Sequence, residues 1–133
     1  MPRSRTQSDP EEVQAFAVNA ARTMRDDKCE EVVLLDVRGL SQVCDYVLIG
    51  SGTSQRQMKT TAQSVEDMGK ECGNPPYRSS ADTGANWLVV DFVEVVVHIF
   101  EPEHRLYYDI ESLWGNSRRV DWDDAGEAID ESS

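Results

Sequence analysis

The stretch that decides the fold runs from Asp45 to Lys59 and reads DYVLIGSGTSQRQMK. Its first part, Tyr46–Ile49, is a short run of aromatic and aliphatic residues, which is typical of a buried strand. Two glycines then allow a tight turn. Ser54 and Gln57 have the spacing of a capping box, so the sequence predicts that a helix begins here.

The residues after Ser54 have the periodicity of an amphipathic helix. Apolar side chains recur every three or four residues and therefore share one helical face: Met58, Ala62, Val65, Met68 and Cys72. The breakers at Gly73–Pro76 end this helix. A strand that leads through glycines into a helix N-terminus resembles a phosphate-binding turn, which makes a nucleotide site one hypothesis to test.

Further elements are predicted on both sides of this unit. Asp9 and Pro10 provide the N-cap and the first turn of an N-terminal helix. The other predictions are strands at 31–37, 77–80, 87–92 and 95–100, and a last helix from Pro102 to Gly115 with Leu106, Ile110 and Leu113 in the core. This order predicts an α/β fold in which helices flank a mixed β-sheet.

The composition divides the 133-residue chain into three segments. Residues 1–8 are polar and basic, and we expect a disordered N-terminus. Residues 9–115 carry the apolar periodicity of one folded domain, and the length is sufficient for a real core. From Asn116 onward the periodicity is lost and acids dominate, which predicts an acidic, disordered tail at 116–133.

The net charge of −12 comes from 25 acidic and 13 basic residues. Such a surface repels phosphate groups, so direct binding to DNA or to an anionic membrane is not expected. The alternative is that the charge only keeps the protein soluble. No apolar run approaches the ~18 residues that span a bilayer, and no signal-peptide core is present, which predicts a cytoplasmic protein.

The cysteines and histidines do not form a metal-binding pattern. Cys29, Cys44 and Cys72 are scattered along the chain, which argues against a zinc site or a disulfide framework. His98 lies on the same face of its predicted strand as Val96 and Phe100, so a hydrogen-bonded structural role is the first interpretation. His104 lies in a charged helix start. We therefore predict no metal and no cofactor.

An enzyme is the main alternative. The Gly50-Ser51 turn resembles the opening of the nucleotidyltransferase fold, whose chemistry needs paired carboxylates that hold two metal ions. No acid follows this turn until Glu66, deep in the helix, and Asp91 alone does not hold a metal pair. A Walker lysine is also absent. The sequence therefore favours a binding protein over a catalyst.

Two aromatic residues are candidates for an interface. With about 100° per residue, Tyr108 points away from the predicted core face of the last helix and lies near His104 and Glu111. An exposed tyrosine beside charges is a plausible interface anchor, although single exposed aromatics are ordinary. Trp87 begins its strand next to a polar loop, where exposure and burial are equally compatible with the sequence.

Several blocks, taken together, resemble the ribosomal silencing factor family, known as RsfS or Iojap. They span about Asp9 to Gly115 and comprise Leu35-Asp36-Val37, Gly39-Leu40-Ser41, Asp45-Tyr46, Gly52-Thr53-Ser54, Arg56-Gln57, Trp87–Asp91, Val95–His98, Glu103-His104-Arg105, Tyr107-Tyr108 and Leu113-Trp114. The resemblance implies a non-catalytic relative of the nucleotidyltransferase fold. It implies binding to the large ribosomal subunit through its universal fourteenth protein, which blocks subunit joining and represses translation.

The resemblance also implies which side chains face the partner: Trp87, Leu88, Asp91, His98, Tyr108 and Glu111. The acidic charge would then steer the chain towards a basic ribosomal protein. The sequence departs from the family pattern at Ser80-Ala81 and at the Val93-Glu94 turn. A role as a large-subunit assembly adaptor and a homodimer of the free protein both stay open.

Overall fold

The computed structural model describes residues 9–80, 86–108, 112, 114–115 and 117–122. Within these residues six strands form one sheet in the order β3-β4-β5-β2-β1-β6. The elements, in chain order, are α1 (Pro10–Asp26), β1 (Glu30–Asp36), β2 (Tyr46–Ser51), α2 (Gln55–Glu71), β3 (Arg78–Ser79), β4 (Trp87–Asp91), β5 (Val95–Phe100), α3 (Pro102–Tyr108) and β6 (Arg118–Val120).

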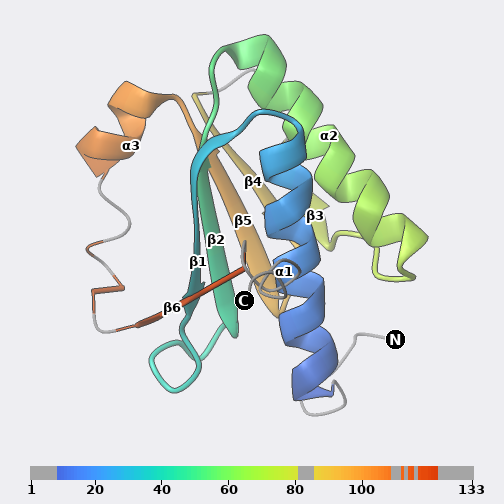
Figure 1. The fold of residues 1–133 in the computed structure, drawn as a ribbon. Coiled ribbons are helices and arrows are strands. Elements are labelled where there is room, and N and C mark those ends of the chain that lie inside the picture. Colours follow the sequence, from blue (N-terminus) through green and yellow to red (C-terminus); the bar gives the residue numbers. More distant parts are fainter. Residues whose placement is uncertain (1–8, 81–85, 109–111, 113, 116, 123–133) are drawn as a thin grey trace, which may run out of the picture.

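The sheet is mixed because its central strand β2 runs parallel to β5 and antiparallel to β1. The pairs β3–β4, β4–β5 and β1–β6 are antiparallel. Figure 1 shows α1 and α2 side by side on one side of the sheet, with α3 beyond the opposite side. The predicted α/β fold with a mixed, helix-flanked sheet is therefore confirmed.

Both long helices begin where the capping residues predict. The Asp9 carboxylate accepts a hydrogen bond from the Glu11 amide at 2.9 Å, and the Ser54 hydroxyl accepts one from the Gln57 amide at 3.0 Å. The Gln57 side chain reaches back to the Thr53 amide, one residue before the N-cap, at 3.0 Å. The cap of α2 is therefore a capping box whose return bond is displaced by one residue.

Alternating strand residues build a core on each side of the sheet. The larger core lies between the sheet and the two long helices and includes Tyr46, Leu48, Val90, Val97 and Ile99. The smaller core lies on the opposite side and consists of Val33, Leu35, Val37, Cys44, Val47, Ile49 and Phe100. All six residues of β2 are buried, as expected for a central strand with a core on both faces.

The first glycine of the deciding stretch has a different role from the predicted one. The strand β2 continues through Gly50 to Ser51, so the turn begins only after them. A Cβ atom at Gly50 would lie 2.5 Å from Met24 Cε and 2.6 Å from Cys29 Sγ. The glycine therefore leaves room for the side chains of Met24 and Cys29, and its φ is not in the left-handed region.

The predicted disordered tail is wrong for the residues from Arg118 to Trp122. Arg118–Val120 form β6, which pairs with β1 and extends the sheet by one strand. Val120 is buried, and the Trp122 indole donates a hydrogen bond to the Val32 carbonyl at 3.1 Å. The remainder of the predicted tail, 123–133, and the predicted N-terminal segment, 1–8, lie outside the described residues.

The hairpin between β4 and β5 has a strained turn. Val93 has a φ of 79°, a region that costs a β-branched residue about 1–2 kcal/mol. The Glu94 amide donates to the Phe92 carbonyl at 3.0 Å, which closes a three-residue turn around Val93. The Asp91 carboxylate holds this turn because it accepts a hydrogen bond from the Val93 amide at 2.8 Å.

We expect Val93→Gly to stabilise the protein by about 0.5–1 kcal/mol, because glycine adopts a positive φ without the steric cost. The gain is smaller than the strain, since glycine loses more chain entropy on folding. Urea denaturation followed by circular dichroism measures the change. Val89→Gly, at a strand position of ordinary conformation, is the matched control and should destabilise. A Val93→Gly variant that is less stable than wild type would show that the turn is not strained.

Candidate partner-binding face

One part of the sheet surface lies away from α1 and α2. We call it the open face and define it by five partly exposed residues of β4 and β5: Trp87, Val89, Asp91, Val96 and His98. The strand register places Val89 opposite His98 and Asp91 opposite Val96. Two aromatic rings, two valines and one acid therefore form a contiguous surface on the side of the sheet that holds the smaller core.

Trp87 is held in place by two aromatic neighbours. Its indole N–H donates a hydrogen bond to Nδ1 of His98 at 3.0 Å. Its ring stacks on buried Phe100, with a centroid separation of 5.0 Å and an interplanar angle of 25°. A large aromatic side chain that is both half-buried and fixed by its neighbours loses little conformational entropy on binding, which suits an interface anchor.

His98 is a neutral hydrogen-bond acceptor in this arrangement. Burial lowers the pKa of its imidazole from 6.5 to about 4, against a small opposing effect of Asp91. Because Nδ1 accepts from Trp87, the proton of the neutral ring lies on Nε2. The predicted role as a hydrogen-bonded structural histidine is confirmed, and its partner is the indole that the same face presents.

The low pKa of His98 predicts an acid-sensitive fold. The pKa of His98 is 6.5 in the unfolded chain and about 4 in the folded chain. Below pH 6.5 the unfolded chain therefore binds more protons than the folded chain, and the free energy of unfolding falls as pH decreases from 6.5 towards 4. The slope is of order 1 kcal/mol per pH unit within that window. Urea midpoints between pH 7.5 and 4.5 measure it.

His98→Gln is the matched variant, since a side-chain amide oxygen can accept from Trp87 without titrating. It should flatten the fall of the urea midpoint between pH 6.5 and 4.5. An unchanged slope in this variant would assign the acid sensitivity to other groups.

The structure does not bring all the predicted partner-binding residues together. Leu88 points to the opposite side of β4 and is 2% exposed in the core under the helices, so it is not available to a partner. Trp87, Asp91 and His98 share the open face, although Asp91 also holds the hairpin turn. Of Tyr108 only the backbone, in α3, is described, and Glu111 lies outside the described residues.

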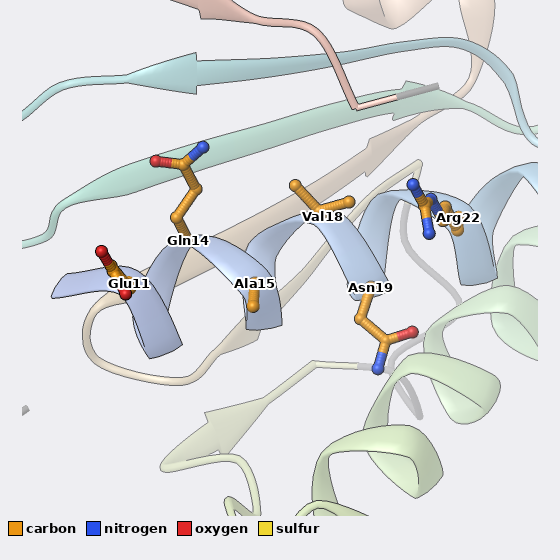
Figure 2. A pocket seen from close by; sticks show the side chains of 6 residues that line it. All are labelled: Glu11, Gln14, Ala15, Val18, Asn19 and Arg22. Atoms are coloured by element: carbon orange, nitrogen blue, oxygen red, sulfur yellow. The ribbon is translucent and has the colours of Figure 1, made fainter. Parts of the chain in front are cut away.

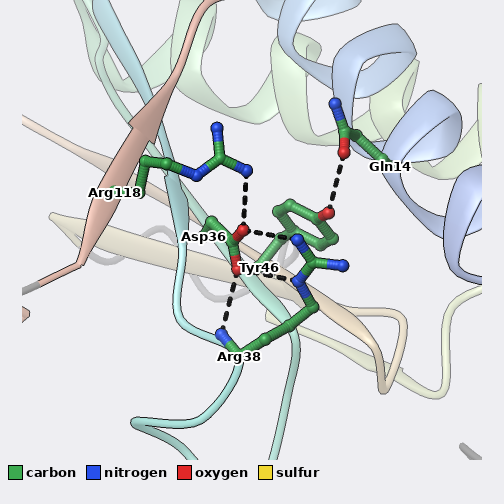
Figure 3. Close-up of polar contacts among 5 residues, drawn as sticks. All are labelled: Gln14, Asp36, Arg38, Tyr46 and Arg118. Atoms are coloured by element: carbon green, nitrogen blue, oxygen red, sulfur yellow. Dashed lines mark hydrogen bonds and ion pairs between the residues drawn. The ribbon is translucent and has the colours of Figure 1, made fainter.

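A charged cluster at the edge of the sheet joins β6 to the rest of the fold (Figure 3). Asp36 accepts hydrogen bonds from the Arg38 guanidinium at 2.9 and 2.7 Å and from Arg118 at 2.9 Å. These contacts lower the pKa of Asp36 to about 2, and the hydrogen bonds from Arg38 have the largest effect. Arg38 lies over the Tyr46 ring, whose hydroxyl donates to Gln14 on α1. The cluster is structural, since it connects β1, β6 and α1.

A shallow pocket of about 620 Å³ runs along the outer surface of α1 (Figure 2). It is lined by Glu11, Gln14, Ala15, Val18, Asn19 and Arg22. Arg22, at one end, donates a hydrogen bond to the Trp122 carbonyl at 3.3 Å. None of the predicted partner-binding residues lines this pocket.

Two of the three cysteines are buried. Cys29 and Cys44 are buried as small hydrophobic residues, and burial raises the pKa of Cys29 to about 12. Cys72, which the periodicity placed on the apolar face of α2, is the C-cap of that helix and is exposed. The described part of the chain holds no group of three metal-ligating side chains and no helix long and apolar enough to cross a membrane.

The comparisons with known proteins agree with one another. A family model described as "Ribosomal silencing factor during starvation" matches residues 10–133. The ribosomal silencing factor RsfS of Bacillus subtilis is 36% identical over 104 residues, which cover 78% of this chain and 88% of that protein. "Mitochondrial assembly of ribosomal large subunit protein 1" of Mus musculus is 32% identical over 94 residues, 68% of this chain and 41% of that protein.

The fold is shared as well. A crystal structure of a protein from Chromobacterium violaceum superposes with a TM-score of 0.71 at 35% sequence identity, and the match covers 81% of this chain and 88% of that one. The family model therefore spans nearly the whole chain, and relatives of similar length align with it in sequence and in structure. The chain belongs to the ribosomal silencing factor (RsfS) family.

Proposed function

We propose that this protein represses translation by binding the large ribosomal subunit through its universal fourteenth protein and blocking subunit joining sterically. The observation that carries the proposal is the open face, which the fixed aromatic side chain of Trp87 shares with Val89 and Val96. An aromatic anchor within a small apolar patch is the usual centre of a protein–protein interface.

The charge supports a basic partner. With a net charge of −12, the chain is attracted to a basic ribosomal protein and repelled by the rRNA phosphates around it. The negative charge therefore favours binding to a basic ribosomal protein over binding to rRNA. Large-subunit involvement is supported by the name of the mouse relative, which concerns assembly of the large ribosomal subunit. The same name supports a second candidate function, in which the protein is an adaptor for assembly of the large subunit.

We propose that the protein acts by occupancy and has no catalytic turnover. At Gly50-Ser51, the dipeptide that resembles the opening of the nucleotidyltransferase fold, the Ser51 hydroxyl accepts a hydrogen bond from the guanidinium of Arg105, which is 6% exposed. A buried cation at this position opposes the binding of a second cation. Asp91, the single candidate carboxylate, is engaged with the Val93 amide.

Sedimentation tests the proposed partner. Purified protein is mixed with isolated large subunits, isolated small subunits or joined ribosomes and separated on sucrose gradients. We expect co-migration with large subunits only. Co-migration with joined ribosomes would contradict the proposed joining face, and co-migration with small subunits would contradict the proposed partner.

A further inference from the structure

The helix α3 is short, and among its described side chains two consecutive ones contact the rest of the fold. With about 100° between neighbouring helical residues, His104 and Arg105 point in different directions from the helix. His104 contacts the segment before β4, and Arg105 contacts the ends of β1 and β2. Both residues belong to the Glu103-His104-Arg105 block, to which the predicted partner-binding set assigns no role.

Arg105 is the buried contact. Its Nη1 donates hydrogen bonds of 2.8 Å to the Glu31 carbonyl and 2.8 Å to the Ser51 hydroxyl. Arg105 is 6% exposed and Ser51 is 4% exposed, so water does not compete strongly for these bonds. One guanidinium nitrogen thereby joins α3 to two neighbouring strands.

The Glu31 carbonyl is available because β1 contains a bulge. The pairing of β1 with β2 shifts between Glu30 and Val33, so two residues of β1 face one residue of β2. Glu31 has a φ of 50°, an uncommon conformation for a residue other than glycine. Such strain persists when the surrounding structure stabilises it, and the hydrogen bond from Arg105 to this carbonyl is one stabilising contact.

His104 is the outer contact. The Asn86 side chain accepts from Gln55 at 2.8 Å through its oxygen, so its nitrogen donates to Nε2 of His104 at 3.2 Å. Nδ1 then carries the proton and lies 3.3 Å from the Glu101 carboxylate, in an electrostatic contact whose alignment is not that of a hydrogen bond. His104 thus links α3 to the residue that precedes Trp87 in the chain.

We propose that His104 and Arg105 act together as a clamp that fixes the position of α3 relative to the open face. They are positioning residues: they set where the α3 backbone at Tyr108 lies with respect to Trp87. This proposal rests on the proposed function, because a fixed distance between the two predicted anchors matters only if one partner contacts both. Without the clamp, binding would have to order α3 as well as form the contacts.

The test measures the order of α3 and partner binding separately. Amide hydrogen exchange, read by mass spectrometry, is compared for α3 and α1 in wild type, Arg105→Met, Arg105→Lys and Ser51→Ala. In Arg105→Met we expect exchange in α3 to be about tenfold faster with α1 unchanged, and affinity for large subunits to fall about tenfold. Arg105→Lys keeps the charge and should restore part of both losses. Ser51→Ala removes one acceptor and should loosen α3 less.

Arg22→Met is the matched control, because Arg22 also donates to a backbone carbonyl but lies on α1. It should leave the exchange of α3 unchanged. If amide exchange accelerates equally in α3 and α1 in all the Arg105 and Ser51 variants, these contacts stabilise the whole fold and do not order α3 specifically. That result would overturn the proposal. Faster amide exchange in α3 without any loss of affinity for large subunits would also overturn the proposal. If wild type itself does not bind large subunits, the proposed function fails, while the exchange data still decide whether the clamp orders α3.

Discussion

Truncation after Asn116 is expected to lower the free energy of unfolding by about 3 kcal/mol and the melting temperature by on the order of 10 °C. The cut removes β6, and with it the buried side chain of Val120 and the ion pair between Arg118 and Asp36. It also removes Trp122, whose ring lies beneath the Arg25 guanidinium and whose indole binds the Val32 carbonyl. Thermal denaturation followed by circular dichroism measures the loss.

The matched control is truncation after Trp122, which keeps every described residue of β6 and its contacts. Because the eleven residues removed carry five acids and little apolar surface, we expect the melting temperature to stay within about 2 °C of wild type. Equal melting temperatures for wild type and the protein truncated after Asn116 would mean that β6 contributes no stability.

The second large effect concerns Trp87. Replacement by alanine should weaken binding to large subunits by about 2 kcal/mol or more, roughly thirtyfold, because it removes the aromatic anchor of the open face. It should also lower stability, since the stack on Phe100 and the hydrogen bond to His98 are lost together. Affinity is measured by fluorescence anisotropy of a labelled protein titrated with large subunits.

Two variants separate binding from folding. Trp87→Phe keeps an aromatic ring near Phe100 but loses the indole N–H and part of the ring area, so it should retain more affinity than Trp87→Ala. Tyr77→Ala removes an aromatic side chain that is 67% exposed and lies before β3, outside the open face, and should bind as wild type does. Equal binding by folded Trp87→Ala and wild type would exclude Trp87 as an anchor.

The fold was largely predictable because its signals are local. The caps at Asp9 and Ser54, the apolar runs of β2 and β5 and the breakers after α2 each act within a few residues. β6 was missed for the opposite reason. A three-residue strand has no detectable periodicity, and its stability comes from partners distant in sequence, above all Asp36 and Val32.

The candidate site was predictable in composition but not in orientation. Family resemblance selected Trp87, Leu88 and Asp91 together, yet adjacent strand residues point to opposite sides, so Leu88 is buried in the core while Trp87 is only half-buried. Strand periodicity could have revealed this conflict. The hydrogen bond between Trp87 and His98 and the bond from Arg105 to the bulge at Glu31 depend on tertiary register, which no local pattern contains.

Subunit joining in vitro tests the central proposal most directly. Large subunits are incubated with increasing protein, small subunits are then added in joining buffer, and light scattering reports joined ribosomes. We predict that joining falls in proportion to the occupied fraction of large subunits, that Trp87→Ala inhibits far less at equal concentration, and that preincubation with small subunits has no effect. If saturated large subunits join small subunits as fast and as completely as free ones, steric occlusion is contradicted.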